Sequence, residues 1–499
     1  MPIVSRAAPL LLAAIAALTY GATASAIATT RSLWLDEVLA VWAARLPNPS
    51  DVVSAIWNGA EFSPPTYDIF LHTLFQAAGS DPLTARLPSI VAVLLTAALI
   101  GYIVDKRLGE PFGALAFALT LNSALFDYAI QARAYALLTT LLAGALVLWI
   151  DSPNRVRPAR AAGIALCLFA SVSLHYYAVV TFAVFALLES LWSFAHRRVR
   201  AGMWIAFAAG AAPCALWLPL MRRHASLNSG DVNSPEFYAA PTLAKLSEHA
   251  QALFVGVTEN WAFVLAAILV LTTAAVYARL VPPAQSDRTE YGESDLVIAG
   301  AGLIAALPIA FLLALTVTHA FSARYALSAS LGAVLLATVA IHRAPYRTAV
   351  AYALIVLLCL MPFTRGLPPD FARAAKQILA QHPTTGPIVV GDADLFIELL
   401  EAADSETRAR IVHLTRPAGV VDGNTASENQ IMRLKASFRP DLPIFDFAAF
   451  TGERRDFVML ARPGWRNDAL ADYFVAKGWV SGALSMGQRI SLLQMRTPR

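Results

Sequence analysis

Long uninterrupted apolar runs, separated by short polar stretches, occupy the first three quarters of the chain. About 20 apolar residues in a helix cross the hydrocarbon core of a bilayer, and a helix satisfies its own backbone hydrogen bonds there. The pattern therefore predicts about eleven membrane-spanning helices. We expect them at residues 8–29, 87–104, 111–126, 134–150, 159–175, 177–195, 202–221, 253–279, 295–318, 324–341 and 347–363.

The pattern changes after about residue 364, where charged residues become frequent and apolar runs become short. Four short runs predict strands: GPIVVGDAD, RIVHLT, DFVMLAR and RISLLQM. Three longer ones predict helices: FARAAKQILAQ, LFIELLEAA and ALADYFVAKGW. We therefore expect a transmembrane domain over 1–363 and a small soluble α/β domain over 364–499 that folds on its own. The second domain has no phosphate-binding glycine loop, so we assign it no chemistry.

One polar segment, residues 30–86, is too long to be a turn between spans. It contains two helix-like pieces, Asp36–Arg45 and Tyr67–Ala78, separated by the helix breaker at Ser63–Pro65. In the second piece Ile69, Phe70, Leu74 and Phe75 share one face. This amphipathic pattern predicts short helices that lie along the membrane surface.

Composition agrees with a polytopic membrane protein, since 57% of residues are hydrophobic and 14% are charged, against about a quarter charged in soluble proteins. The net charge of +4 does not indicate nucleic-acid binding, because the basic residues lie in short clusters between spans. The three cysteines lie inside apolar runs without zinc or disulfide spacing. ATASAIA before Thr29 resembles a signal-peptidase site, but Arg6 alone precedes a nearly full-length span, which favours an uncleaved helix.

Lys and Arg are denser in one set of loops than in the other, and the denser set is expected in the cytoplasm. The amino terminus is then cytoplasmic. With an odd number of spans, the loop at 30–86 and the C-terminal domain face outward, into the periplasm of a Gram-negative inner membrane. The denser set comprises Arg6, Lys106, Arg107, Arg155, Arg157, Arg160, Arg197, Arg198, Arg200, Arg279, Arg288, Arg343 and Arg347.

Polar and aromatic residues gather at the outward ends of the predicted spans. A carboxylate there can accept the proton of an incoming hydroxyl or amine, and arginines can stabilise a leaving phosphate. Tyrosine and histidine can bind sugar rings, so the set fits glycosyl transfer from a polyprenyl-phosphate sugar. Asp36 is the candidate base, Arg133 a candidate phosphate ligand, and the candidate substrate-binding residues are Tyr67, His72, Tyr128, Tyr135, His175, Tyr176 and Tyr325.

Each motif also has a structural interpretation. Asp36 and Glu37 could cap a helix, a boundary arginine could extend to the lipid head groups, and a His-Tyr-Tyr run could belong to an aromatic belt. A transporter or flippase of lipid-linked glycans is the alternative function, although such proteins carry more mid-span charges and internal repeats. A protein that binds polyprenyl phosphates without turnover is a third possibility, against which Asp36 argues.

The order of several motifs resembles a known family. LWLDE, SPPTYDIFLH, ARLPS, QARAYALL, LHYY and FSARY follow one another over about residues 1–345. This order resembles the bacterial GT-C glycosyltransferases, in particular the branch of protein O-mannosyltransferases and the lipid A aminoarabinose transferase. LWLDE followed by PPxY and ARLPS is the most specific part of the resemblance.

The resemblance implies Asp36 as the catalytic base, Glu37 as its acidic neighbour, and Arg133, Arg86 and Arg324 as donor-phosphate ligands. It also implies an outward acceptor on a protein, a lipid or another glycan, and no cofactor or catalytic metal. Two positions depart from the family pattern. Ser63 stands where many relatives have His, and Gln131 stands where many have Glu.

Overall fold

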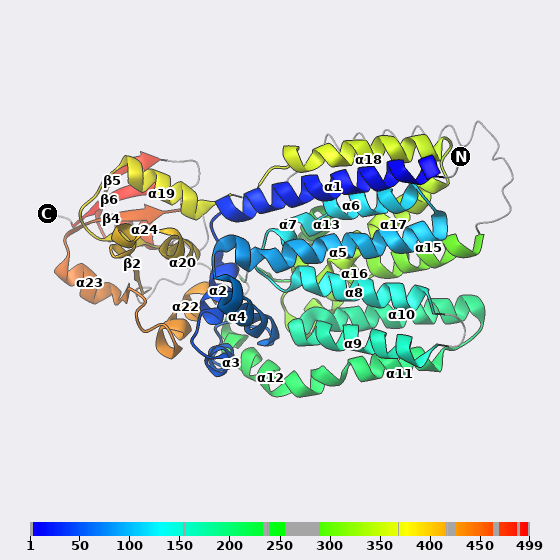
Figure 1. Ribbon diagram of the computed structural model, residues 1–499. Helices are drawn as coiled ribbons and strands as arrows, with labels where there is room; N and C mark the ends of the chain where they lie inside the picture. Colours follow the sequence, from blue (N-terminus) through cyan, green and yellow to red (C-terminus); the bar gives the residue numbers. More distant parts are fainter. Residues whose placement is uncertain are drawn as a thin grey trace.

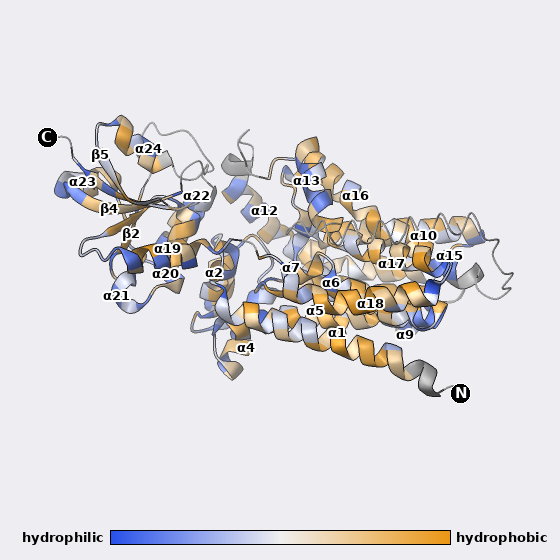
Figure 2. Ribbon diagram, turned by 90° about the horizontal axis from the view of Figure 1, so that it is seen from above, coloured by the Kyte–Doolittle hydropathy of each residue, from blue (hydrophilic) through white to orange (hydrophobic). Residues whose placement is uncertain are grey.

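The computed structural model describes residues 3–152, 156–232, 237, 239–254, 290–367, 369–415, 417, 426–462, 469–486 and 490–497. Figure 1 shows a bundle of roughly aligned helices with an α/β domain at one end. The amino terminus lies at the opposite end of the bundle. Figure 2 shows that apolar residues predominate along the bundle, whereas hydrophilic residues are frequent in the α/β domain. The predicted polytopic helical fold with a small C-terminal α/β domain is confirmed.

Ten of the predicted spans coincide with helices in the described part of the chain, and residues 255–279 of the predicted span at 253–279 lie outside it. Six described helices are long and apolar enough to cross a membrane, and further apolar helices are shorter. The bundle comprises α1 (Ile3–Thr30), α5 (Pro82–Leu108), α6 (Phe112–Asn122), α7 (Leu125–Ala129), α8 (Tyr135–Ile150), α9 (Pro158–Leu174), α10 (Val179–His196), α11 (Ala201–Gly210), α12 (Ala212–Val232), α13 (Leu243–Phe254), α15 (Glu290–Ile304), α16 (Ala306–Leu313), α17 (Ser328–His342) and α18 (Arg347–Thr364).

The segment between α1 and α5 lies between the bundle and the α/β domain (Figure 1). It contains α2 (Leu35–Ala44), α3 (Pro49–Trp57) and α4 (Thr66–Ala78). The sequence interpretation omitted α3, although Pro49 at its first position is a typical helix start.

Helix α2 is buried by protein, which the prediction of a surface helix did not anticipate. Every residue of α2, all of which the structure describes, is buried except Asp36. In α4, Phe70 is exposed whereas His72 and Phe75 are buried. The α/β domain packs on α2, so the apolar residues of α2 face protein.

The α/β domain contains a six-stranded sheet in the order β3-β2-β1-β4-β6-β5. Strands β3, β2, β1 and β4 run parallel, whereas β6 runs antiparallel to both β4 and β5. All the strands and helices predicted here are present, and three helices and two strands are additional: α21, α22, α23, β3 and β5. The elements are α19 (Phe371–Gln381), β1 (Ile388–Val390), α20 (Ala393–Ala402), α21 (Ser405–Arg408), β2 (Ile411–Leu414), α22 (Ala426–Ser437), β3 (Ile444–Phe445), α23 (Phe447–Glu453), β4 (Asp456–Ala461), α24 (Ala469–Ala476), β5 (Val480–Met486) and β6 (Ser491–Arg496).

Helix α20 joins this domain to α2 through a shared hydrophobic core. The Leu35 N–H donates to Glu398 Oε1 at 3.1 Å, and the Trp42 indole N–H donates to Glu401 Oε2 at 2.8 Å. Burial raises the pKa of the Glu398 carboxyl to about 8. The α/β domain therefore fixes the helix that carries Asp36.

We predict that residues 366–499 expressed alone unfold cooperatively, because Val389, Phe457 and Phe474 belong to a core cluster inside the domain. The fragment should also expose the face of α20 that α2 covers in the full chain, which should make it prone to self-association. Thermal circular dichroism and light scattering measure both properties. A broad melt would contradict an independently folding domain, and sugar transfer by the fragment would contradict a site in the bundle.

Candidate active site

Asp36 lies in the first turn of α2, with its side chain 22% exposed. The residue before the helix is Trp34, and the carboxylate that accepts its backbone N–H is that of Glu37, at 3.2 Å. The Asp36 carboxylate instead accepts from Arg324 Nη1 at 2.8 Å. Glu37 thus supplies the local cap, and Asp36 faces a distant part of the chain.

Two arginines from separate segments converge on Asp36. Arg133, in the turn between α7 and α8, donates from Nη1 to the Asp36 carbonyl at 2.9 Å and to Glu61 Oε1. Arg324 belongs to the 3₁₀ turn η3 (Ala323–Ala326). Both guanidinium groups lie near the ring of Tyr135, at 5.7 and 5.6 Å from its centroid. The site therefore combines a partly exposed carboxylate with two cations.

Aromatic rings continue from Tyr135 along one side of this site. The centroid of Tyr135 lies 5.7 Å from Tyr128 and 5.3 Å from His175, and His175 lies 5.9 Å from Tyr325. Tyr325 stacks on Tyr177 at 3.5 Å and 4°. Tyr177, which was not among the principal sequence candidates, also donates to the Ala320 carbonyl at 2.6 Å. The resulting cluster offers ring faces and polar edges of the kind that bind sugars.

A backbone hydrogen bond orients the His175 ring in this cluster. Its Nδ1 accepts the Tyr177 backbone N–H at 3.1 Å, so a neutral ring with its proton on Nε2 fits the geometry. His175 can therefore bind a hydroxyl without adding positive charge beside the arginines.

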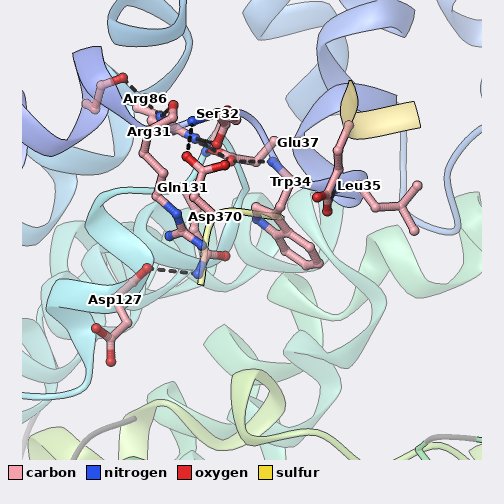
Figure 3. A network of polar contacts seen from close by, with 12 residues as sticks. Arg31, Ser32, Trp34, Leu35, Glu37, Arg86, Asp127, Gln131 and Asp370 are labelled. Carbon is pink, nitrogen blue, oxygen red and sulfur yellow. Dashed lines mark hydrogen bonds and ion pairs between the residues drawn. The ribbon is translucent and has the colours of Figure 1, made fainter. Parts of the chain in front are cut away.

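Glu37 and Arg86 form a buried ion pair (Figure 3), and both side chains are 0% exposed. Arg86 Nε and Nη2 donate to the two Glu37 oxygens at 2.7 and 2.6 Å. Its other N–H groups donate to the carbonyls of Ala28, Arg31 and Ser32, each at 2.9 Å. A guanidinium has five N–H groups, and all five of Arg86 are thus directed at protein acceptors.

The pair also holds the segment that carries Arg133. Glu37 Oε1 accepts the Ala132 backbone N–H at 2.7 Å. Gln131, one of the two departures from the family pattern, donates its amide to the Asp127 carbonyl at 2.8 Å (Figure 3). Hydrogen bonds of the two preceding residues, Gln131 and Ala132, therefore fix the backbone that carries Arg133.

Three sequence candidates lie outside the aromatic cluster that begins at Tyr135. His72 is buried, with Nδ1 3.0 Å from the Ala44 carbonyl, and so links α4 to α2. Tyr176 contacts His224 of α12, with its hydroxyl 3.5 Å from Nδ1. Tyr67 is buried on α4, near enough to Arg133 and Glu37 for their charges to act on it. The roles predicted for these residues stay predictions.

Two buried carboxyl groups complete the surroundings of Arg133, and the sequence interpretation missed both. Glu61 pairs with Arg133 and accepts from Ser63 Oγ at 3.1 Å. Asp68 is 0% exposed, and burial followed by the charge of Glu61 raises its pKa well above the usual range. Both acids flank the Pro-Pro motif in EFSPPTYD, which was the available signal.

The described residues contain no group of three or more His, Cys, Asp or Glu side chains that could hold a metal ion. The groups that converge are carboxylates, guanidinium groups and aromatic rings. Such a set can accept a proton from a nucleophile and bind an anionic leaving group beside a ring-shaped substrate.

No family model and no curated protein matches the chain. Among solved structures, ArnT from Cupriavidus metallidurans in the apo state is similar at 11% identity and a TM-score of 0.46, covering 97% of both chains. Its complex with undecaprenyl phosphate gives 0.44 at the same identity and coverage. The archaeal oligosaccharyltransferase AglB from Archaeoglobus fulgidus, in complex with an inhibitory peptide and a dolichol-phosphate, has 11% identity and a TM-score of 0.48. That match covers 91% of this chain and 69% of AglB.

Proposed function

We propose that the protein is a GT-C-type membrane glycosyltransferase that moves a sugar from a polyprenyl-phosphate donor to an outward acceptor. The observation that carries the proposal is the position of Asp36. It is the residue of α2 that is not buried, and its carboxylate and carbonyl face Arg324 and Arg133. A solvent-accessible acid that faces two cations suits a reaction in which a nucleophile loses a proton as a phosphate departs.

In the proposed reaction an acceptor hydroxyl or amine attacks the anomeric carbon of the donor sugar. The bond between that carbon and the phosphate oxygen breaks, and the electron pair leaves with the polyprenyl phosphate. Asp36 takes the proton of the acceptor, while Arg133 and Arg324 stabilise the growing charge on the phosphate. Tyr135, His175 and the stacked tyrosines bind the sugar.

Glu37 and Arg86 act in this proposal as positioning residues. Their bonds hold the start of α2 against the end of α1 and against the Ala132 backbone. The sequence predicted that Arg86 binds the donor phosphate. We propose instead that Arg86 fixes Asp36 and Arg133 relative to each other.

The proposed location is a bacterial inner membrane, with the amino terminus in the cytoplasm and the α/β domain in the periplasm. The loop charge bias supports it. So does the placement of the amino terminus and the α/β domain at opposite ends of the bundle (Figure 1). The donor can then stay anchored in the bilayer while its phosphate reaches the end of the bundle at Asp36.

We predict that Arg133→Ala weakens donor binding by about 10-fold or more and lowers turnover by about 10²-fold, because one charged donor to the phosphate is lost. Transfer of radiolabelled sugar from a polyprenyl-phosphate donor by purified protein measures both effects. Arg222→Ala is a matched control, since Arg222 is an exposed arginine on α12. Wild-type activity in Arg133→Ala would contradict the proposed site.

A further inference from the structure

Arg133, the proposed phosphate ligand, already has an anionic partner. Glu61 lies in the segment between α3 and α4, and its Oε1 accepts from Arg133 Nη1. The two side chains are 5% and 11% exposed, so little water screens the pair. Arg324 is likewise paired with Asp36. An incoming phosphate therefore meets two guanidinium groups that are each bonded to a carboxylate.

The backbone on both sides of Glu61 is anchored. The Ala60 carbonyl accepts from Gln430 of α22 at 2.8 Å. The Phe62 ring lies 5.4 Å from the His224 ring and 5.4 Å from the Arg433 guanidinium. Because these neighbours come from α12 and α22, the chain on either side of Glu61 is fixed. Movement of Glu61 relative to Arg133 must then come from its side chain.

We propose that Glu61 is a displaceable counterion, which holds Arg133 in place while the site is empty and yields it to the donor phosphate. The inference rests on the proposed function, because it takes Arg133 as a phosphate ligand. A carboxylate and a phosphate cannot both keep full negative charge beside one guanidinium in a poorly solvated place without repulsion. Asp36 adds a third negative charge nearby.

The displaced Glu61 then takes up a proton from solvent. Burial raises the pKa of its carboxyl, the charge of Arg133 opposes this rise, and Asp36 reinforces it. When the phosphate takes Arg133, the opposing influence is lost and the pKa rises further. Asp68 of α4 lies near enough to interact with Glu61, and burial raises the pKa of its carboxyl well above the usual range, which favours a protonated Asp68 that can donate to the released carboxyl. Ser63 Oγ is the other hydrogen-bond donor at this position.

Phosphate affinity should therefore depend on pH with a definite sign. Phosphate binding takes up one proton, so affinity should fall as pH rises, by up to about 10-fold per pH unit between the free and bound pKa values of Glu61. A phosphate monoester has its second pKa near about 6. The charge of the lipid therefore hardly changes between about pH 7 and pH 9, and that interval isolates the protein.

The test is the affinity of purified full-length protein for undecaprenyl phosphate across this interval. We expect wild-type affinity to fall with pH. Glu61→Gln should bind about 10-fold more tightly at the alkaline end, with almost no pH dependence, because Gln fills the same space without charge. Glu61→Asp should keep the wild-type slope. Glu293→Gln is the matched control, since Glu293 pairs with Arg343 at the end of the bundle far from Asp36.

A Glu61→Gln protein with a wild-type melting temperature, weaker binding and an unchanged pH slope would overturn the inference. If Glu61→Gln does not fold, a flat profile in Glu61→Asp would overturn it as well. Equal absence of undecaprenyl phosphate binding in wild type and Arg133→Ala would instead overturn the proposed function, and the inference with it. The presence of undecaprenyl phosphate binding thus tests the proposed function, and the pH dependence of that binding tests the inference.

Discussion

Replacing Asp36 by Asn should lower turnover by about 10²–10⁴-fold, the usual contribution of a positioned general base, while the protein remains folded. The amide oxygen of Asn can still accept from Arg324, but an amide cannot take the proton of an acceptor. Donor affinity should be kept, because the phosphate is bound by arginines. The measurement is single-turnover transfer at saturating donor, alongside the melting temperature.

An Asp36→Asn protein that transfers sugar at the wild-type rate would refute Asp36 as the base. A structural role predicts the opposite pattern, in which stability falls and the remaining folded protein is fully active. Asn and Asp are equivalent helix caps, and Glu37 rather than Asp36 accepts the Trp34 N–H. The substitution therefore separates catalysis from capping.

Replacing Arg86 by Met should destabilise the protein more than any of the other substitutions proposed above. It leaves Glu37 as an unpaired buried carboxylate and removes the donors to three carbonyls. Breaking a buried ion pair on one side costs about 3–5 kcal/mol. We expect a large drop in melting temperature in detergent and loss of activity. The melting temperature of Arg86→Lys should lie between those of the wild type and Arg86→Met, because Lys keeps the charge but offers fewer donors.

The same variant tests the phosphate-binding role that the sequence predicted for Arg86. If Arg86 binds the donor, Arg86→Met should weaken undecaprenyl phosphate binding at an unchanged melting temperature. If Arg86 positions α2, the same substitution should lower the melting temperature. The second pattern is expected, since all five N–H groups of Arg86 are directed at protein acceptors.

The helices of the bundle could be predicted from the sequence because bilayer thickness sets their length. Burial of α2 could not be predicted in this way. Its partner α20 lies more than 300 residues later in the chain, and the bond from Leu35 to Glu398 joins residues 363 positions apart. The sequence of an apolar helix face does not indicate whether lipid or protein packs against it.

Asp36, Arg133 and Arg324 were predicted as a group, and the structure brings them together. The position of Arg86 could not be predicted in the same way, because an arginine that binds a carboxylate and one that binds a phosphate use the same donors. Glu61 and Asp68 were missed because the Pro-Pro motif that they flank marks the segment but does not reveal that its carboxyl groups will be buried beside an arginine.

The shared core of α2 and α20 determines how this chain could be recombined with another. A chimera joined near residue 364, where the hydropathy changes, would place foreign side chains against Leu35 and Trp42. It would also remove Glu398 and Glu401 from their partners on α2. We expect a functional chimera only when residues 31–81 are exchanged together with the α/β domain. The proposed base would then come from the parent that supplies the α/β domain. Both proposed phosphate-binding arginines would come from the parent that supplies the bundle.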